Sequence, residues 1–313
     1  MEIKVNESRF SVFLFPLVII APFFLWGTAM VAMKGVIPET TPLFLGGMRL
    51  LPAGVLVIIA GMMLNRPHPK GWLAWGWITL FALVDGTLFQ GFLAEGLVKT
   101  GAGIGSVMID SQPLMIAVLS SLLFGDRVRK IGWLGLGLGM IGISLIGLPE
   151  SWLLQLLQGN VTDLNINLPS LFTNGEVLML LAALSMAGGT ILIRYVCHHV
   201  DSVMATGWHL LLGGVPLFFL SGVTESQQWQ NVSVEGWFAI LYATVCGSAI
   251  AYGLFFYLAS RRNLTSFASL TFLTPIFALL FGNLVLQEQL TAIQTGGVCL
   301  TLISIYLINQ RKE

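Results

Sequence analysis

The sequence predicts an all-α integral membrane protein whose ten transmembrane helices form two inverted five-helix repeats. Three observations predict this fold: an apolar composition, a one-sided distribution of Lys and Arg, and a similarity between the two halves of the chain. Of the 313 residues, 56% are hydrophobic and 10% are charged, whereas a soluble domain carries about 25% charged residues. The composition therefore favours a chain that is surrounded by lipid.

Apolar segments of about 20 residues, the length that crosses a bilayer as a helix, recur from one end of the chain to the other. The first segment is long and lacks the small-residue cleavage site of a signal peptide, so we expect it to remain as a span. We place the ten spans at residues 10–32, 41–63, 72–97, 102–124, 131–149, 174–197, 202–222, 235–259, 264–286 and 291–309.

The distribution of basic residues tests this count. With a cytoplasmic N-terminus, cytoplasmic segments hold 12 of the 15 Lys and Arg residues, and the opposite loops hold only Lys34 and Lys99. Cytoplasmic loops of membrane proteins carry such an excess of positive charge. With one span more or fewer, the Lys and Arg residues would no longer lie mainly on one side of the membrane. We therefore expect a multi-pass protein with both termini in the cytoplasm. Without an apparent transit peptide, we expect it in the bacterial inner (plasma) membrane.

The two halves of the chain resemble each other weakly but in the same order. The segment with Pro113 and Asp126 aligns with the one that holds Pro275 and Glu288. This divides the chain into a first repeat at 1–149, a non-cytoplasmic linker at 150–173 and a second repeat at 174–313. Because each repeat has an odd number of spans, the second enters the membrane from the opposite side, as in many secondary transporters.

Four segments carry a resemblance to a known family: "FLWGTAMVAMK", the Arg in "GGMRLLPAG", "QPLMIAVLSSLLFGD" and "LTPIFALLFGNLVLQEQ". They resemble the EamA family of the drug/metabolite transporter superfamily, in particular its cyanobacterial and plant-plastid members. The resemblance covers nearly the whole chain as two EamA repeats. It implies a ten-helix basket with a central cavity and the export or exchange of amino acids or other small metabolites.

Charged side chains inside spans point to a functional site, because each costs about 2.5–3.5 kcal/mol at the centre of a helix on insertion scales. Arg49 either binds a substrate carboxylate or forms a structural ion pair with Asp85 or Asp110. Asp85 is the candidate for coupling, because a carboxyl group in the middle of the membrane could exchange a proton for the solute. The alternative is a permanent salt bridge between Asp85 and Arg49.

Other polar residues of the spans are candidates for the transport path. Asp110 and Gln112 precede Pro113, which we expect to kink its span, as we expect of Pro275 in the second half. His209 either titrates near neutral pH or is a neutral, hydrogen-bonded core residue. Aromatic faces suit apolar or cationic solutes, and the aromatic candidates for the path are Trp26, Trp208 and Tyr252.

Two polar residues after Asp85 in the same span have a structural interpretation. Glu95 lies four residues before Lys99, a spacing that favours an ion pair at the outer rim, although Glu95 could also line an outer vestibule. α-Helical geometry places Gln90 about 140° around the helix from both acids, so the three do not form one polar stripe. We expect Gln90 to hydrogen-bond to a neighbouring helix.

Glycine spacing predicts how the last span of each repeat packs. The sequence "GWLGLGLGMIGISLIG" contains Gly135 and Gly139 four residues apart, and the last span contains Gly296 and Gly297. Small residues at such spacing let helices approach closely in lipid. We expect span 5 to pack on span 10, and a homodimer formed through these glycines is the alternative.

The sequence also argues against several classes of protein. A net charge of zero gives no basic face for nucleic acid. The three cysteines and four histidines lack metal-ligand spacing, and we find no phosphate-binding loop or nucleophile motif. We therefore expect no cofactor and no enzymatic activity. A secondary transporter of a small solute is the leading hypothesis, and a passive channel or a lipid flippase is the alternative.

Overall fold

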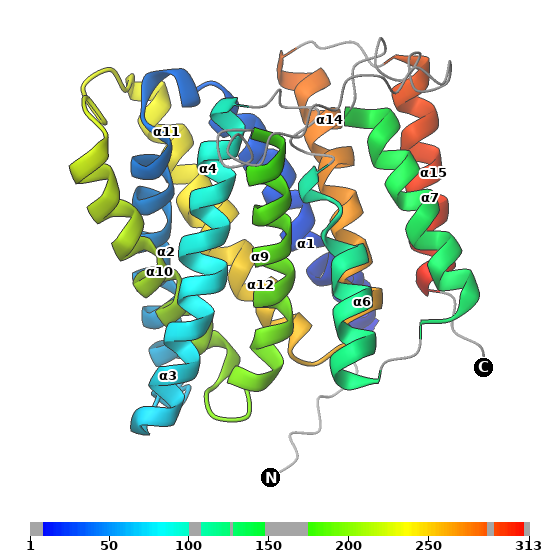
Figure 1. The fold of residues 1–313 in the computed structure, drawn as a ribbon, viewed down its shortest axis with the longest axis horizontal. Helices are drawn as coiled ribbons and strands as arrows, with labels where there is room; N and C mark the ends of the chain where they lie inside the picture. The colour runs from blue at the N-terminus through cyan, green and yellow to red at the C-terminus, as the bar shows by residue number, and fades with distance from the viewer. Residues whose placement is uncertain (1–8, 100–107, 126–127, 148–174, 287–290, 310–313) are drawn as a thin grey trace.

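The computed structural model describes residues 9–99, 108–125, 128–147, 175–286 and 291–309, and every regular element in them is helical (Figure 1). The first half contains α1 (Arg9–Lys34), η1 (Ile37–Glu39), α2 (Pro42–Met63), α3 (Gly71–Phe81), η2 (Ala82–Phe89), α4 (Gln90–Lys99), α6 (Gln112–Phe124) and α7 (Lys130–Gly147). The second half contains α9 (Gly175–Val196), α10 (Ser202–Thr224), α11 (Val234–Tyr242), η4 (Ala243–Ile250), α12 (Ala251–Ala259), α13 (Leu264–Ala268), η5 (Ser269–Phe272), α14 (Leu273–Leu286) and α15 (Ala292–Asn309).

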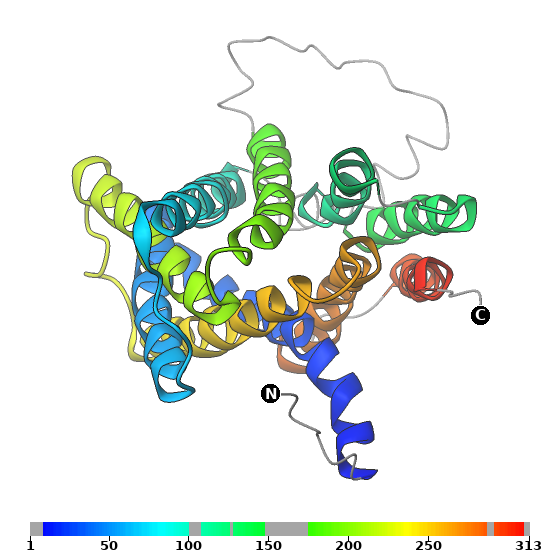
Figure 2. The same ribbon diagram turned by 90° about the horizontal axis from the view of Figure 1, so that it is seen from below.

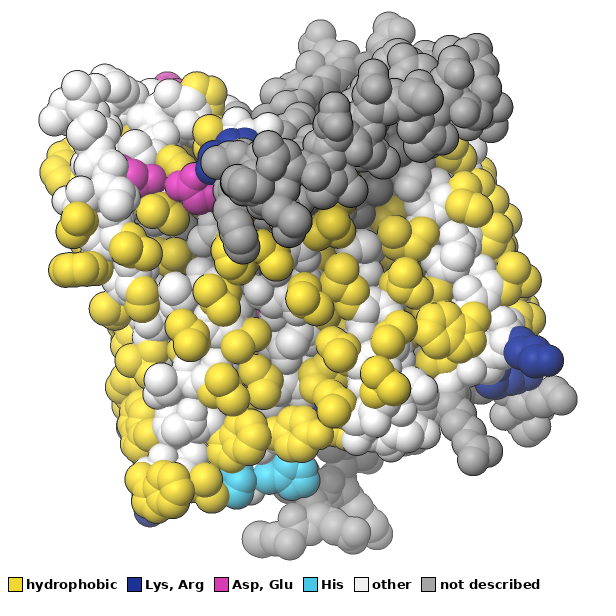
Figure 3. Space-filling view, viewed as in Figure 1, with side chains coloured by type: hydrophobic (Ala, Val, Ile, Leu, Met, Phe, Trp, Pro, Cys, Tyr) yellow, Lys and Arg dark blue, Asp and Glu magenta, His cyan; other side chains and the backbone are white. Residues whose placement is uncertain are grey.

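Eight of the described helical segments are long and apolar enough to cross a membrane. Two further apolar helices are shorter, at Gln112–Phe124 and Lys130–Ile146. On the face shown in Figure 3, hydrophobic side chains cover the middle of the bundle, whereas charged and His side chains gather toward its two ends. The chain is thus a multi-pass membrane protein. The predicted linker at 150–173 lies outside the described residues.

The third span of each half contains a π-helix in its middle. In the first half η2 connects α3 to α4, and in the second half η4 connects α11 to α12. The sequence predicted a helix over each span but not the change in its geometry. Such π-helical turns are rare and frequently mark functional sites.

Glycine contacts bring the two halves together along α10. A Cβ atom at Gly86 of η2 would lie 2.7 Å from the Cα of Gly213 of α10, and one at Gly54 of α2 would lie 2.5 Å from the backbone nitrogen of Leu211. These distances are too short for any side chain. Glycine at both positions therefore lets α10 pack tightly against η2 and α2, as small residues do in membrane bundles.

The glycine-rich last span of the first half packs on the last span of the second, as predicted. α7 and α15 lie side by side at one edge of the bundle (Figures 1 and 2). A Cβ atom at Gly142 would lie 2.9 Å from the carbonyl oxygen of Gly297, and one at Gly135 would lie 3.1 Å from the carbonyl oxygen of Ser304. These glycines hold the scaffold together, away from the buried charges.

The two prolines that we expected to kink spans lie in the first turns of helices. Pro113 is the second residue of α6, and Pro275 is the third residue of α14, which follows the 3₁₀-helix η5. Proline is tolerated there because the N–H groups of a first turn have no partner within the helix. Each proline thus marks where a helix begins.

Candidate functional site

A buried acid of the first half contacts a buried histidine of the second half. Oδ2 of Asp85, on η2, lies 3.0 Å from Nε2 of His209, on α10, and both side chains are fully enclosed. Nδ1 of His209 lies 2.8 Å from the carbonyl oxygen of Thr206. The ring of Phe81 stacks on the imidazole with centroids 4.0 Å apart. His209 is therefore held on three sides.

Space for Asp85 comes from a glycine of a third helix. Gly189 of α9 faces Asp85 so closely that a Cβ atom at Gly189 would collide with the carboxylate. The second carboxylate oxygen, Oδ1, is buried without a hydrogen-bond partner among the described residues. The pair between Asp85 and His209 thus lies where η2, α9 and α10 meet.

Arg49 of α2 is buried without an acidic partner. Arg49 is only 7% exposed. Its Nη2 donates a hydrogen bond of 3.2 Å to Oγ of Ser248 on η4. Nε has no partner, and none of the ion pairs formed by the described residues includes Arg49. The salt bridge to Asp85 or Asp110, which the sequence left open, is not formed.

Further unused hydrogen-bond donors belong to Tyr252 and to Trp26, which contacts it. Ser248 and Tyr252 are one helical turn apart along η4 and α12. The Tyr252 hydroxyl accepts a bond of 2.7 Å from Nε2 of Gln90, so its own proton remains free to be donated. The ring of Trp26 contacts Tyr252 with centroids 5.2 Å apart, and its Nε1 is buried without a partner in the described part of the chain.

The next two candidates are Gln112, the first residue of α6, and Asp110, which lies two residues before it. Nε2 of Gln112 donates a bond of 3.2 Å to the hydroxyl of Thr190 on α9, the residue after Gly189. Asp110 is only 7% exposed, and it contacts neither Arg49 nor His209 through a hydrogen bond or ion pair. The sequence therefore identified Asp110 as buried, but the structure does not join it to the other charges.

The remaining candidates lie away from these contacts. Trp208 packs against Trp75 and His68, with ring centroids 4.8 and 5.6 Å apart. His68 belongs to the connection between α2 and α3, so this aromatic group lies at the end of the bundle. Glu95 forms the predicted i,i+4 ion pair with Lys99, with an N···O distance of 3.3 Å.

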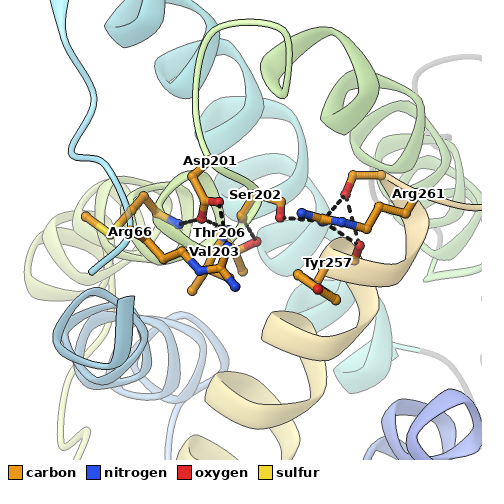
Figure 4. A network of polar contacts seen from close by, with 9 residues as sticks. Arg66, Asp201, Ser202, Val203, Thr206, Tyr257 and Arg261 are labelled. Carbon is orange, nitrogen blue, oxygen red and sulfur yellow. Dashed lines mark hydrogen bonds and ion pairs between the residues drawn. The ribbon is translucent and has the colours of Figure 1, made fainter. Parts of the chain in front are cut away.

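Polar contacts tie the start of α10 to its neighbours at the same end of the bundle (Figure 4). Arg66, just after α2, lies 3.6 Å from Asp201, which also caps α10 through a bond of 2.9 Å from the Val203 N–H. Arg261, just after α12, donates a bond of 3.0 Å to the Ser202 hydroxyl. Both arginines thus fasten this end of α10 to the ends of α2 and α12.

An acid fastens the other end of α10. Glu225, just after α10, accepts bonds of 2.9 and 3.0 Å from the N–H groups of Leu43 and Phe44, and one of 2.7 Å from the Thr41 hydroxyl. The carboxylate thus satisfies the free N–H groups at the start of α2, where negative charge is favoured. The end of α2 thus contacts the start of α10, and the end of α10 contacts the start of α2, so the two helices run antiparallel.

Sequence reasoning missed three residues that complete these contacts. Ser248, Thr190 and Gly189 are small residues in apolar runs, and only their partners give them a role. The one signal in the sequence was their position in the third span of the second half and in the first span after the linker. Among the described residues, no group of three His, Cys, Asp or Glu could hold a metal ion.

A helical membrane bundle whose interior carries charged and hydrogen-bonding side chains from several helices has the build of a membrane transporter. Comparison with known proteins agrees with this class. Residues 14–148 and 173–310 each match the model of the EamA-like transporter family. The chain belongs to this family, with one copy of its repeat in each half.

Similar proteins occur in cyanobacteria and plants. The chain is 61% identical over 297 residues to a protein of Synechocystis sp. described as an uncharacterized transporter, covering 95% of this chain and 90% of that one. It is 48% identical over 296 residues to a WAT1-related chloroplastic protein of Arabidopsis thaliana, covering 93% and 68%. A crystal structure with 15% identity superposes with a TM-score of 0.76 over 93% of this chain and 96% of the other, a likeness of fold.

Proposed function

We propose that this protein is a secondary transporter that moves small organic solutes bearing a carboxylate, amino acids or related compounds, by alternating access. The supporting observation is a buried cation without an acid, together with buried donors that lack acceptors. Arg49 Nε–H, Trp26 Nε1–H and the Tyr252 hydroxyl are all unused donors. A carboxylate supplies both the missing negative charge and the missing acceptors, and arginine binds it through two parallel bonds.

The proposed architecture is ten spans in two inverted repeats, 1–149 and 174–313. The eight long helices and the two shorter apolar ones support a count of ten crossings. A reciprocal contact supports the inversion. A basic residue in the second span of each half, Arg49 or His209, contacts the π-helix in the third span of the other half, at Ser248 or Asp85. Two bundles related in this way could open to either side in turn.

The excess of Lys and Arg on one side supports cytoplasmic N- and C-termini, and the related inner membrane transporter YedA of Escherichia coli, 25% identical, supports a plasma-membrane location. No cofactor is needed, because the energy of such a transporter comes from a gradient or from exchange. Whether α7 and α15 also form a homodimer contact is a separate question that cross-linking in membranes would answer.

Thermal unfolding of the purified protein tests the carboxylate site, because a bound solute stabilises the folded state by mass action. The panel consists of the protein amino acids and small carboxylic acids, each paired with its primary amide. At a concentration of 100 times Kd, a bound solute adds about 2.7 kcal/mol of stability. We expect at least one acid to raise the unfolding temperature while its amide does not.

Arg49→Gln should abolish this response, and the matched control Glu95→Gln, which changes a rim ion pair, should keep it. An acid and its amide that stabilise equally, or an Arg49→Gln protein that responds like the wild type, would contradict the proposed site. Saturable uptake with counterflow in proteoliposomes would then separate a transporter from a passive channel.

A further inference from the structure

The geometry around Asp85 and His209 fixes how many protons the two side chains hold. The carbonyl oxygen of Thr206 can only accept, so Nδ1 of His209, 2.8 Å away, must carry a hydrogen. The contact of 3.0 Å between Nε2 and Oδ2 of Asp85 then needs one more proton, on either atom. Wherever that proton lies, the pair as a whole is neutral, and without it the pair carries one negative charge.

The surroundings of this proton exclude water. Phe81 covers one face of the imidazole, and the edge contact with Phe256 has centroids 5.3 Å apart. Gly189 closes the side of Asp85 toward α9. Both members of the pair are fully enclosed. The shared proton can therefore reach water only when the contact of α10 with η2 and α9 opens.

Few other titratable groups face the pair. From α12, the ring of Tyr252 lies 6.4 Å from that of His209, and α9 presents Gly189 and Thr190, which do not titrate. Arg49 of α2 hydrogen-bonds to Ser248, which lies one helical turn before Tyr252. Asp110 makes no hydrogen bond or ion pair with these groups in the described ranges. Arg49 is thus the charge that the pair must balance.

We infer that Asp85 and His209 together carry one proton that crosses the membrane with each solute of net charge −1 whose carboxylate is held at Arg49. The inference rests on the proposed function. Isolated charge inside a bundle costs several kcal/mol, so the forms that cross are those whose charges cancel. With a solute of net charge −1, such as a monocarboxylate or an acidic amino acid, the solute cancels Arg49 and the pair keeps its proton. Without solute, the pair gives up its proton, and its negative charge cancels Arg49.

The balance of each cycle is simple. One proton binds from water at the contact between Nε2 and Oδ2 on the side where the solute binds, and it leaves on the other side after the solute has dissociated. No bond other than that to the proton forms or breaks. Solute and proton therefore move in the same direction, as in a symporter.

The test measures proton and solute fluxes in the same vesicles. Protein is reconstituted into phosphatidylethanolamine and phosphatidylglycerol vesicles that contain the pH-sensitive dye pyranine, and ¹⁴C-labelled glutamate and aspartate are added outside. We expect the label to enter and the lumen to acidify, at about one proton per solute because the pair holds one exchangeable proton. In Asp85→Asn we expect the proton flux per solute to fall to zero, whatever solute flux is left.

His209→Gln is the second variant if Asp85→Asn is unstable, and Glu95→Gln, an acid-to-amide change in the same span, is the control that keeps the ratio. If the label enters without acidification, or Asp85→Asn and His209→Gln both keep the wild-type ratio, the inference is wrong while the proposed function stands. If the lumen becomes more alkaline as the label enters, solute and proton exchange in opposite directions, which also overturns it. If no label enters, the proposed transport of acidic amino acids fails.

Discussion

Two of the polar contacts between the halves of this protein involve equivalent positions but different partners. In both, a basic residue of a second span reaches the π-helix of the opposite half. His209 meets an acid, Asp85, and both side chains are enclosed. Arg49 meets only the hydroxyl of Ser248 and keeps its charge. The comparison teaches that, of two basic residues at equivalent positions in similar halves, one can be paired with an acid while the other keeps an unpaired charge that we propose binds a ligand.

The largest effect on stability should come from breaking the closed contact. Asp85→Ala leaves His209 buried beside an empty space, and removing one member of a buried pair costs about 3–5 kcal/mol. The loss of the monodisperse peak after heating, used as the readout of unfolding, would measure this loss of stability. If the double variant Asp85→Ala/His209→Ala were no more stable than the sum of the single changes implies, the two residues would not act as a unit.

A smaller loss should follow from filling the space beside Asp85. Gly189→Ala puts a methyl group against the carboxylate, and overpacking of this kind typically costs about 1–3 kcal/mol. Gly188→Ala is the matched control, since its Cβ atom would lie 3.2 Å from a methyl carbon of Val84, which can shift. Equal unfolding temperatures for the two variants would show that the close approach of α9 to η2 is relaxed in the membrane.

The smallest effect on stability should come from the open contact. Ser248→Ala removes one hydrogen bond to Arg49, and side-chain hydrogen bonds in membrane bundles average about 0.6 kcal/mol. Because Ser248 orients the guanidinium of the proposed solute site, we expect solute affinity to change more than the unfolding temperature. A Ser248→Ala protein that loses stability as strongly as Asp85→Ala would mean that the open contact is structural after all.

The sequence predicted much of the fold because lipid imposes simple rules. Apolar runs and the positions of Lys and Arg located the spans, and internal similarity with the quoted motifs identified the EamA family. Buried charge is rare enough in spans that Arg49, Asp85 and Asp110 stood out as candidates. The spacing of glycines in α7 and α15 predicted that these two helices pack together, because small residues let helices approach closely in lipid.

What the sequence determined by itself was thus the class of protein, the positions of its eight long apolar helices and its buried charged residues Arg49, Asp85 and Asp110. Only the tertiary structure decided that Asp85 pairs with His209 rather than with Arg49, and that Arg49 has no acidic partner among the described residues. A contact between residues 124 positions apart depends on how helices rotate and slide against each other. The π-helices also change the angular step between residues, so faces calculated for regular α-helices do not hold beyond Asp85.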